Sequence, residues 1–201
     1  MTDAGSADKA LQLLIQGNAR FRTGEARFTA MRPAMLANLA KGQSPFATVL
    51  CCSDSRVIPE LIFDTVLGEL FVIRVAGNVL SSEIAGSIQY AGLYLATPLF
   101  VVLGHSGCGA VRAALEYRSV GTKQASRIQV LVNCIVPALA EIDPALQPDE
   151  QMPRAVEANV RWTMRQLLET EAGARVAAGE FKLTGGIYDM ASGVVRFLDS
   201  T

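Results

Sequence analysis

The sequence predicts an α/β fold: a mostly parallel β-sheet flanked by helices, with an antiparallel edge strand and an N-terminal helical arm. Four short apolar, β-branched runs, at 46–51, 70–75, 99–104 and 181–188, alternate with stretches of helical character. Buried strands that alternate with helices are typical of a parallel sheet covered by helices. The chain has 201 residues, 50% of them hydrophobic, which is enough for one well-buried core.

The N-terminal region, residues 1–40, is expected to form a helical arm ahead of an α/β core at 46–201. Apolar residues recur at helical spacing over 6–22, which predicts an amphipathic helix. A second short helix is expected over 31–40, before the stretch KGQSP. The chain has no internal repeat and no linker-like stretch, so residues 1–201 are expected to form a single domain.

Further helices are expected between and after the strands. Their predicted ranges are 59–66, with Pro59 at the first helical position, 83–95, 123–142 and 153–171. The C-terminal stretch YDMASGVVRFL contains a turn at 191–193. Residues 194–198 are therefore expected to add an antiparallel edge strand.

Composition excludes several classes of function. The net charge of −1 provides no basic face, so we expect no nucleic-acid partner. The segment 84–111 lacks charged residues, but Gln89, Pro98 and several glycines interrupt it, so we expect a buried core and no membrane partner. The first residues do not resemble a secretory signal. Four cysteines without such a signal indicate a reducing compartment, the cytoplasm.

Two motifs follow predicted strands directly. CCSDSR occupies 51–56 after the first strand, and GHSGCG occupies 104–109 after the third. The second motif contains His105, the only histidine of the chain. Ligands of open α/β sheets bind outside the carboxyl ends of the strands. We therefore expect the two motifs to meet in space and to form a site.

A hydrolase nucleophile is the first interpretation of these motifs. GHSGC resembles the G-x-S-x-G turn of serine hydrolases, with Ser106 at its centre. Such a serine needs a separate histidine as general base, and the only histidine is its neighbour. A cysteine–histidine hydrolase fails similarly, because His105 and Cys108 belong to one local turn. The nucleophile interpretation is therefore rejected.

Ordinary core packing is the second interpretation, since an isolated cysteine is usually a small buried hydrophobe. We accept it for Cys134, which lies in an apolar run, and for Cys51. Successive strand side chains point to opposite faces, so Cys51 and Cys52 do not easily serve one site. Core packing does not explain why both strand ends carry metal-ligand residue types together with an Asp and an Arg.

A metal site is the third interpretation. A tight turn opening a helix can direct His105 and Cys108 at one ion, and Cys52 supplies a third ligand. Two thiolates and one imidazole suit Zn²⁺, and three protein ligands leave the open position of a catalytic zinc. Arg56 can hold Asp54 ionised in a bidentate pair, so that Asp54 accepts a proton at the centre. A plain structural ion pair is the alternative for these two residues.

The combination CSDSR…GHSGCGAV resembles the β-class carbonic anhydrases, and the resemblance extends over nearly the whole chain, through LIQGNARF, KGQSPF, LGELFVIRVAGN, GSIQYA and YDMASGVVRFL. It implies one zinc ion per chain, with Cys52, His105 and Cys108 as its ligands. It implies a catalytic dyad of Asp54 and Arg56, and in some family members the aspartate also binds zinc reversibly.

The resemblance also implies a substrate pocket. Phe71, Ala76 and Tyr90 would line it, and a backbone group of Gly109 would approach it. The side-chain amide of Gln43 would hydrogen-bond substrate or bicarbonate across a dimer interface. The family forms dimers or dimers of dimers, in which the N-terminal helix reaches over the partner.

The implied reaction is the reversible hydration of CO₂ to bicarbonate and a proton, in which zinc-bound hydroxide attacks CO₂ and the Asp–Arg dyad orients it. Val49 stands where bicarbonate-regulated members have a tryptophan, which disfavours that type of regulation. Two alternatives remain open: hydrolysis of CS₂ or COS on the same scaffold, and a noncatalytic zinc-binding homologue. The intact dyad argues against the second, because a structural zinc needs no such pair.

Overall fold

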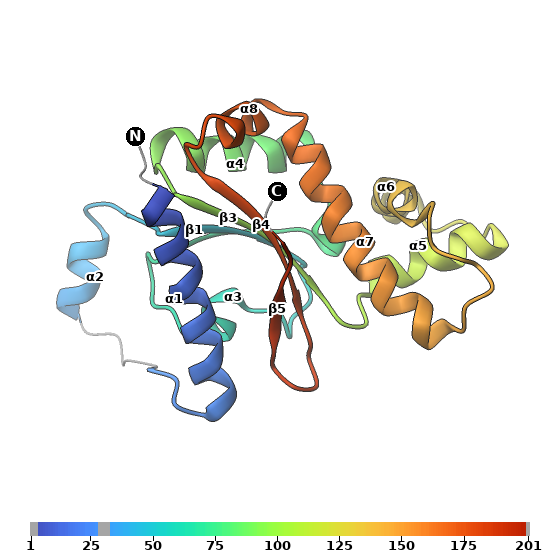
Figure 1. Cartoon of the computed structure of the whole chain (residues 1–201), viewed down its shortest axis with the longest axis horizontal. Coiled ribbons are helices and arrows are strands. Elements are labelled where there is room, and N and C mark those ends of the chain that lie inside the picture. Colours follow the sequence, from blue (N-terminus) through green and yellow to red (C-terminus); the bar gives the residue numbers. More distant parts are fainter. Residues whose placement is uncertain (1–3, 28–32, 200–201) are drawn as a thin grey trace.

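A five-stranded sheet forms the centre of the computed structural model, which describes residues 4–27 and 33–199 (Figure 1). The strand order is β2-β1-β3-β4-β5. The strands are β1 (Ala47–Cys51), β2 (Leu70–Arg74), β3 (Leu99–His105), β4 (Lys182–Tyr188) and β5 (Val195–Phe197). The first four are parallel, and β5 runs antiparallel to β4. The predicted fold class is confirmed, with every strand within one residue of its expected bounds.

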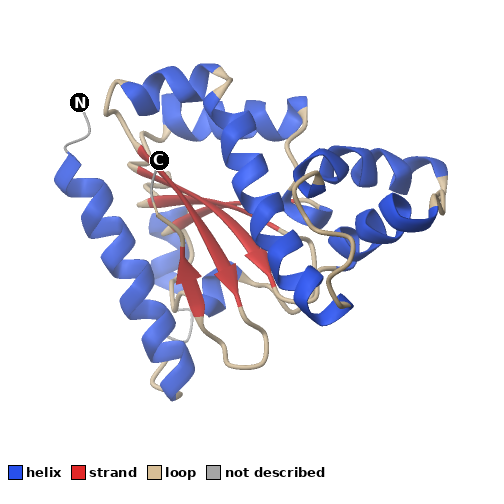
Figure 2. Ribbon diagram, turned by 45° about the vertical axis from the view of Figure 1, so that its right-hand side comes forward, coloured by secondary structure: helices blue, strands red, loops and turns tan. Residues whose placement is uncertain are grey.

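Helices cover both faces of this sheet. They are α1 (Ala4–Thr23), α2 (Pro33–Leu39), α3 (Pro59–Ile62), α4 (Ser82–Tyr94), α5 (Gly109–Val120), α6 (Ser126–Ile135), α7 (Pro148–Leu168) and α8 (Glu171–Ala177), with 3₁₀ turns η1 (Ala76–Asn78) and η2 (Val136–Leu139). The α1 and α3 helices pack on one face, and α4, α7 and α8 pack on the other (Figure 2). None of the helices in the described ranges is long and apolar enough to cross a membrane.

Several helices differ from their predicted bounds. The α3 helix stops at Ile62, because Asp64 adopts a left-handed conformation with φ 46°. The stretch expected to form one helix over 123–142 divides into α6 and η2 at Val136, just before Pro137, which has no N–H to continue the α-helical pattern. The α7 helix starts five residues earlier than predicted, with Pro148 in its first turn.

Other elements were not predicted with bounds, or lie partly outside the described residues. The α5 helix follows the turn that contains His105 and Cys108, and the sequence predicts only that a helix starts there. The short α8 helix was missed; Thr170 caps it and separates it from α7. The helix predicted over 31–40 is described only as α2 at 33–39, and its first two residues lie outside the described ranges.

The N-terminal helix α1 packs against the sheet of its own chain. Leu14 is fully buried there. The Asn18 amide donates hydrogen bonds to the carbonyl oxygens of Ile62 (3.2 Å) and Gly193 (2.9 Å), and its oxygen accepts one from the Val195 N–H (2.9 Å). These bonds tie α1 to α3 and to the β4–β5 hairpin. The expectation that this helix reaches over a partner subunit stays a prediction.

Candidate metal centre

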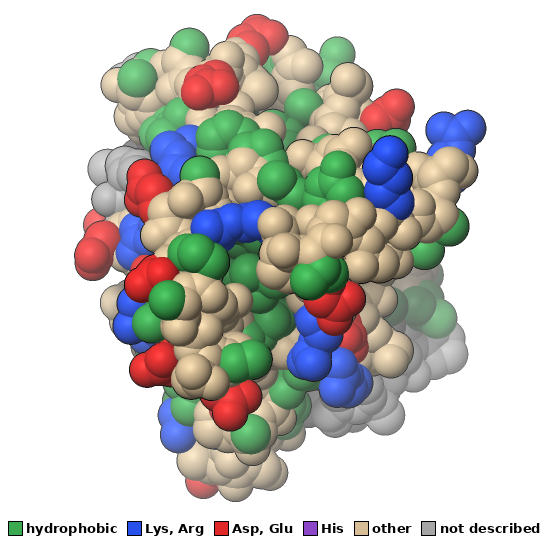
Figure 3. All heavy atoms as spheres, turned by 90° about the vertical axis from the view of Figure 1, so that its right-hand side faces the viewer, with side chains coloured by type: hydrophobic (Ala, Val, Ile, Leu, Met, Phe, Trp, Pro, Cys, Tyr) green, Lys and Arg blue, Asp and Glu red, His purple; other side chains and the backbone are tan. Residues whose placement is uncertain are grey.

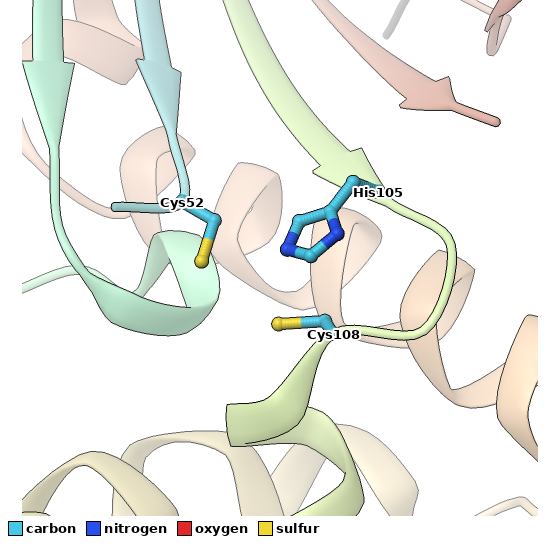
Figure 4. Close-up of side chains that lie close together, drawn as sticks. All are labelled: Cys52, His105 and Cys108. Atoms are coloured by element: carbon cyan, nitrogen blue, oxygen red, sulfur yellow. The ribbon is translucent and has the colours of Figure 1, made fainter. Parts of the chain in front are cut away.

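The three predicted metal ligands come from the ends of two neighbouring strands. Cys52 follows the last residue of β1, and His105 is the last residue of β3. Because β1 and β3 pair in parallel, with Cys51 opposite Leu103, their carboxyl ends bring these side chains together. Cys108 immediately precedes α5. The turn between β3 and α5 directs its thiol back toward His105 (Figure 4).

The donor atoms converge. The two sulfurs and a ring nitrogen of His105 all lie within 4.8 Å of one another. All three side chains are buried, with 5% of Cys52, 1% of Cys108 and none of His105 exposed. In the part of the chain that the structure describes, these three are the only such group of candidate ligands. Asp54 does not belong to it.

The hydrogen bonding of the His105 imidazole suits a metal ligand. Its Nδ1 lies 3.0 Å from the carbonyl oxygen of Ser106, so this nitrogen carries the proton and donates. Its Nε2 is buried and has no hydrogen-bond partner among the described residues. A buried nitrogen with a free lone pair is costly unless something binds it. A cation held between Nε2 and the two sulfurs satisfies it, and this donor set suits zinc.

The thiols of Cys52 and Cys108 lie within 4.8 Å of each other, and each shifts the pKa of the other. The hydrogen bond from Cys108 lowers the pKa of the Cys52 thiol, and the same contact raises the pKa of Cys108. One sulfur therefore has thiolate character before any cation binds. Ionising the second requires a nearby positive charge, which a divalent metal supplies.

Cys51, the other half of the doubled cysteine, lies on the opposite face. It is fully buried in the core between the sheet and α1, and burial raises the pKa of its thiol to about 12. This thiol stays protonated and apolar at ordinary pH. The predicted division of Cys51 and Cys52 between two faces is confirmed.

Asp54 and Arg56 form a bidentate ion pair beside the ligands. Arg56 Nε lies 2.9 Å from Asp54 Oδ1, and Nη2 lies 2.8 Å from Oδ2. The Arg56 backbone N–H also donates to Oδ1 at 3.0 Å. These bonds to Arg56 hold the pKa of Asp54 well below its usual range. The contacts from Arg56 therefore favour the ionised carboxylate, which accepts hydrogen bonds.

Sequence analysis missed Arg74, which braces this segment. Its guanidinium donates to the carbonyl oxygens of Cys52 (3.4 Å) and Asp54 (2.8 Å). One feature of the sequence could have indicated Arg74. It lies near the end of the predicted strand 70–75, which lies beside the strand that leads to Cys52. Gly77 was missed as well, although its N–H donates to Cys52 Sγ at 3.3 Å.

Within one chain, the residues predicted to line the substrate pocket do not all lie together. Ala76 lies in η1 beside Gly77, and Gly109 is the first residue of α5, directly after a ligand. Phe71 and Tyr90 pack together, with ring centroids 6.1 Å apart, on edge strand β2 and helix α4. Gln43 lies exposed in the loop before β1.

Comparisons with known proteins agree on one family. The family model described as carbonic anhydrase matches residues 47–195. The protein named carbonic anhydrase 2 of Mycobacterium tuberculosis is 38% identical over 194 residues, which cover 96% of this chain and 91% of that protein. A carbonic anhydrase of Mycolicibacterium smegmatis is 35% identical over 187 residues, covering 93% of this chain and 91% of that protein.

Solved structures share the fold. A Coccomyxa β-carbonic anhydrase in complex with acetazolamide has a TM-score of 0.76 and 25% identity, covering 95% of this chain and 87% of that one. A tetrameric β-carbonic anhydrase of Sordaria macrospora has a TM-score of 0.76 at 22% identity, covering 96% and 99%. With its paired motifs, its sheet order and these relatives, the chain belongs to the β-class carbonic anhydrase family.

Proposed function

We propose that this protein hydrates CO₂ reversibly to bicarbonate and a proton, at one zinc ion per chain. The observation that carries the proposal is the convergence of three buried ligands at the ends of β1 and β3, beside the Asp54–Arg56 pair. A purely structural zinc would take a fourth protein ligand and would need no such pair.

The ligands of the proposed ion are Cys52, His105 and Cys108. When bound, zinc acts as a Lewis acid that lowers the pKa of water, to about 7 in favourable sites, and so supplies hydroxide for attack on CO₂. Two thiolates moderate this effect, which leaves a role for the protein. Asp54 accepts a hydrogen bond from the attacking oxygen and turns a lone pair of that oxygen toward the substrate. Arg56 keeps the carboxylate ionised and oriented.

The substrate pocket is proposed to form between two copies of the chain. Ala76 and the backbone at Gly109 adjoin the ligands, while the ring pair of Phe71 and Tyr90 lies on the outer edge of the sheet. Apolar walls suit an uncharged, linear substrate. The Gln43 amide would hydrogen-bond bicarbonate from across the interface. The assembly is a homodimer or a dimer of dimers.

The proton must leave without a histidine shuttle. His105 is the only histidine, and it is committed to the metal. Asp54, another carboxylate, a water chain or external buffer must carry the proton. If Asp54 also binds zinc, it does so by leaving Arg56, and that exchange would close the site.

The proposal also includes the setting of the reaction. We place the enzyme in the cytoplasm, in keeping with four cysteines that are all free thiols. We treat residues 1–201 as one domain with an arm at 1–40. We propose no nucleic-acid partner, in keeping with the net charge of −1, and Lys and Arg lie interspersed with Asp and Glu on the face shown in Figure 3.

The test is stopped-flow CO₂ hydration across pH, with zinc content measured on the same sample. We expect about one zinc per chain and a rate that rises with pH. Cys108→Ser and His105→Ala are expected to lose both zinc and activity, because two protein ligands hold zinc poorly. A fully metallated protein inactive with CO₂ at every pH would contradict the proposal. Activity with CS₂ or COS in that sample would identify the alternative hydrolase. The absence of activity with all three substrates would identify a noncatalytic homologue.

A further inference from the structure

Two buried polar side chains of α7 face the turn that contacts a metal ligand. Asn159 and Thr163 are each only 1% exposed. The Asn159 amide donates to the carbonyl oxygen of Gly77 at 2.8 Å, and the Thr163 hydroxyl donates to that of Asn78 at 3.1 Å. Burying polar groups is costly unless they are hydrogen-bonded. Both bonds end on the same short turn, η1.

This turn has an unusual backbone. Gly77 has φ 72° and Asn78 has φ 44°, so two successive residues adopt the left-handed conformation. Side chains also enclose it, since a Cβ added to Gly77 would lie 2.8 Å from Ile135 Cδ1 and 3.0 Å from Ala110 Cβ. Glycine adopts this region freely and asparagine more readily than most residues, so the sequence permits the turn, and the contacts around it fix its position. Helix α7 supplies two of the bonds that do so.

The turn ends on the metal centre. The Gly77 N–H donates to Cys52 Sγ at 3.3 Å. Gly77 is therefore held on both sides, with its N–H against the sulfur and its carbonyl against Asn159. Hydrogen bonds to a ligand sulfur reduce the electron density that it donates to a metal. In a site with two thiolates, such a bond keeps the ion a stronger Lewis acid.

We propose that Asn159 is a positioning residue for the metal centre. By holding the Gly77 carbonyl it aims the Gly77 N–H at Cys52 Sγ, and so sets the zinc affinity and the charge that this sulfur donates. Thr163 supports the same turn through the next carbonyl. This inference rests on the proposed zinc site, and it assigns part of that site to a helix remote from the ligands in sequence.

Asn159→Leu tests the proposal, because leucine has a similar size and no donor. Zinc affinity is measured by chelator competition with the apoprotein, and the thiolate-to-cobalt charge-transfer band is recorded on the Co²⁺-substituted protein. We expect zinc to bind about 10- to 100-fold more weakly, because the Cys52 thiolate loses the bond that stabilises it and fixes its position, and this loss outweighs the greater charge that the freed sulfur donates. We expect the band to move to lower energy, because a sulfur without its N–H donor is easier to oxidise.

Thr184→Val is the matched control. Thr184 is fully buried and donates to the carbonyl oxygen of Leu198 at 3.0 Å, so it also loses one buried hydrogen bond, but outside the turn. Its zinc affinity and cobalt band are expected to match the parent. An Asn159→Leu protein with parental affinity and band position would overturn the proposal. A control that shifts as far as Asn159→Leu would do the same.

Two further results distinguish a failure of the positioning role from a folding failure and from a failure of the proposed function. If Asn159→Leu does not fold, Thr163→Val removes a single bond from the turn and is expected to shift the cobalt band in the same direction by less; an unshifted band in that variant overturns the proposal. If the parent protein itself binds neither zinc nor cobalt through Cys52 and Cys108, the proposed function fails, and the positioning role fails with it.

Discussion

Two aspartates of this protein are held by arginines, and their surroundings differ. The Asp54 side chain is 18% exposed at the metal centre and has one arginine partner, Arg56. The Asp64 side chain is only 5% exposed, beneath α1, and is bound by Arg20 and Arg27. Burial opposes the ionisation of Asp64, but the bonds from the two arginines outweigh it, and the pKa is lowered. The first carboxylate is partly open to solvent, whereas the second binds the N-terminal arm to the core.

Asp64→Asn is expected to destabilise the fold in a pH-dependent way. Asparagine tolerates the left-handed φ of 46° but carries no charge. Because the folded pKa of Asp64 lies below its usual 3.8, its contribution is complete above that pH and is lost as pH falls through the folded value. We expect a loss of about 1.5–3 kcal/mol at pH 7.

Urea unfolding of parent and variant at a series of pH values measures this contribution. The difference in unfolding free energy should shrink as the pH falls below 4, roughly the usual carboxyl pKa. A difference that stays constant or grows toward acid pH would contradict the assignment of Asp64 as an ionised anchor.

At the scale of elements, α1 approaches α3 very closely. A Cβ added to Gly17 would lie 1.8 Å from the carbonyl oxygen of Phe63, a backbone atom that cannot simply move aside. Alanine normally stabilises a helix interior by about 1 kcal/mol relative to glycine. At this position the steric conflict reverses that preference, because the helix must withdraw from the core.

Gly17→Ala is therefore expected to lower the midpoint of denaturant unfolding. Gln12→Ala, at an exposed position on the same helix, is the control and should change stability by no more than about 0.5 kcal/mol. A Gly17→Ala protein as stable as the parent would mean that α1 does not pack on its own sheet in this position.

The strands were the elements that sequence patterns predicted best. Short apolar, β-branched runs marked the four parallel strands, and the turn at 191–193 marked β5, so all five strands were placed within one residue. The end of α3 could not be predicted in that way. Asp64 holds its left-handed conformation in contact with Arg20, which lies 44 residues earlier in the chain. No local pattern contains that contact.

The metal centre was also predictable only as far as local sequence patterns reach. Spacing and residue type predicted Cys52, His105 and Cys108 as a group, and the structure brings their donor atoms within 4.8 Å of one another, because both motifs follow strands whose carboxyl ends meet at one edge of the sheet. The catalytic and pocket roles drawn from the family stay predictions. Asn159 was missed, since its side chain acts through a carbonyl 82 residues earlier in the chain. Such contacts exist only once the helices are packed.

At the scale of the whole molecule, an aromatic surface lies at the free edge of the sheet. Strand β2 is an edge strand, and beside it Tyr90 is 46% exposed, Leu93 50% and Tyr94 75%. The rings of Tyr90 and Tyr94 lie 5.1 Å apart. Adjacent exposed apolar side chains of this kind mark association surfaces, which agrees with the proposed pairing of two copies here.

Tyr94→Glu is expected to shift the protein toward monomers, because it places a charge in an apolar interface. Sedimentation velocity measures the change, with Val120→Glu as a control at another exposed apolar position, 73% exposed. CO₂ hydration should fall together with the dimer, since the pocket is proposed to draw Gln43 from the partner. An unchanged assembly in the Tyr94→Glu protein would contradict this placement of the interface.

We propose that Asp54 acts at the metal centre as the acceptor that orients the attacking oxygen. Asp54→Asn, assayed by stopped-flow CO₂ hydration with zinc content determined on the same sample, tests it most directly. Asp64→Asn is the matched control, an arginine-bound aspartate away from the metal, and should hydrate CO₂ at the parental rate. We predict full zinc occupancy in Asp54→Asn with kcat/KM lower by about 10²- to 10⁴-fold. A zinc-loaded Asp54→Asn protein that hydrates CO₂ at the parental rate would contradict this role of Asp54.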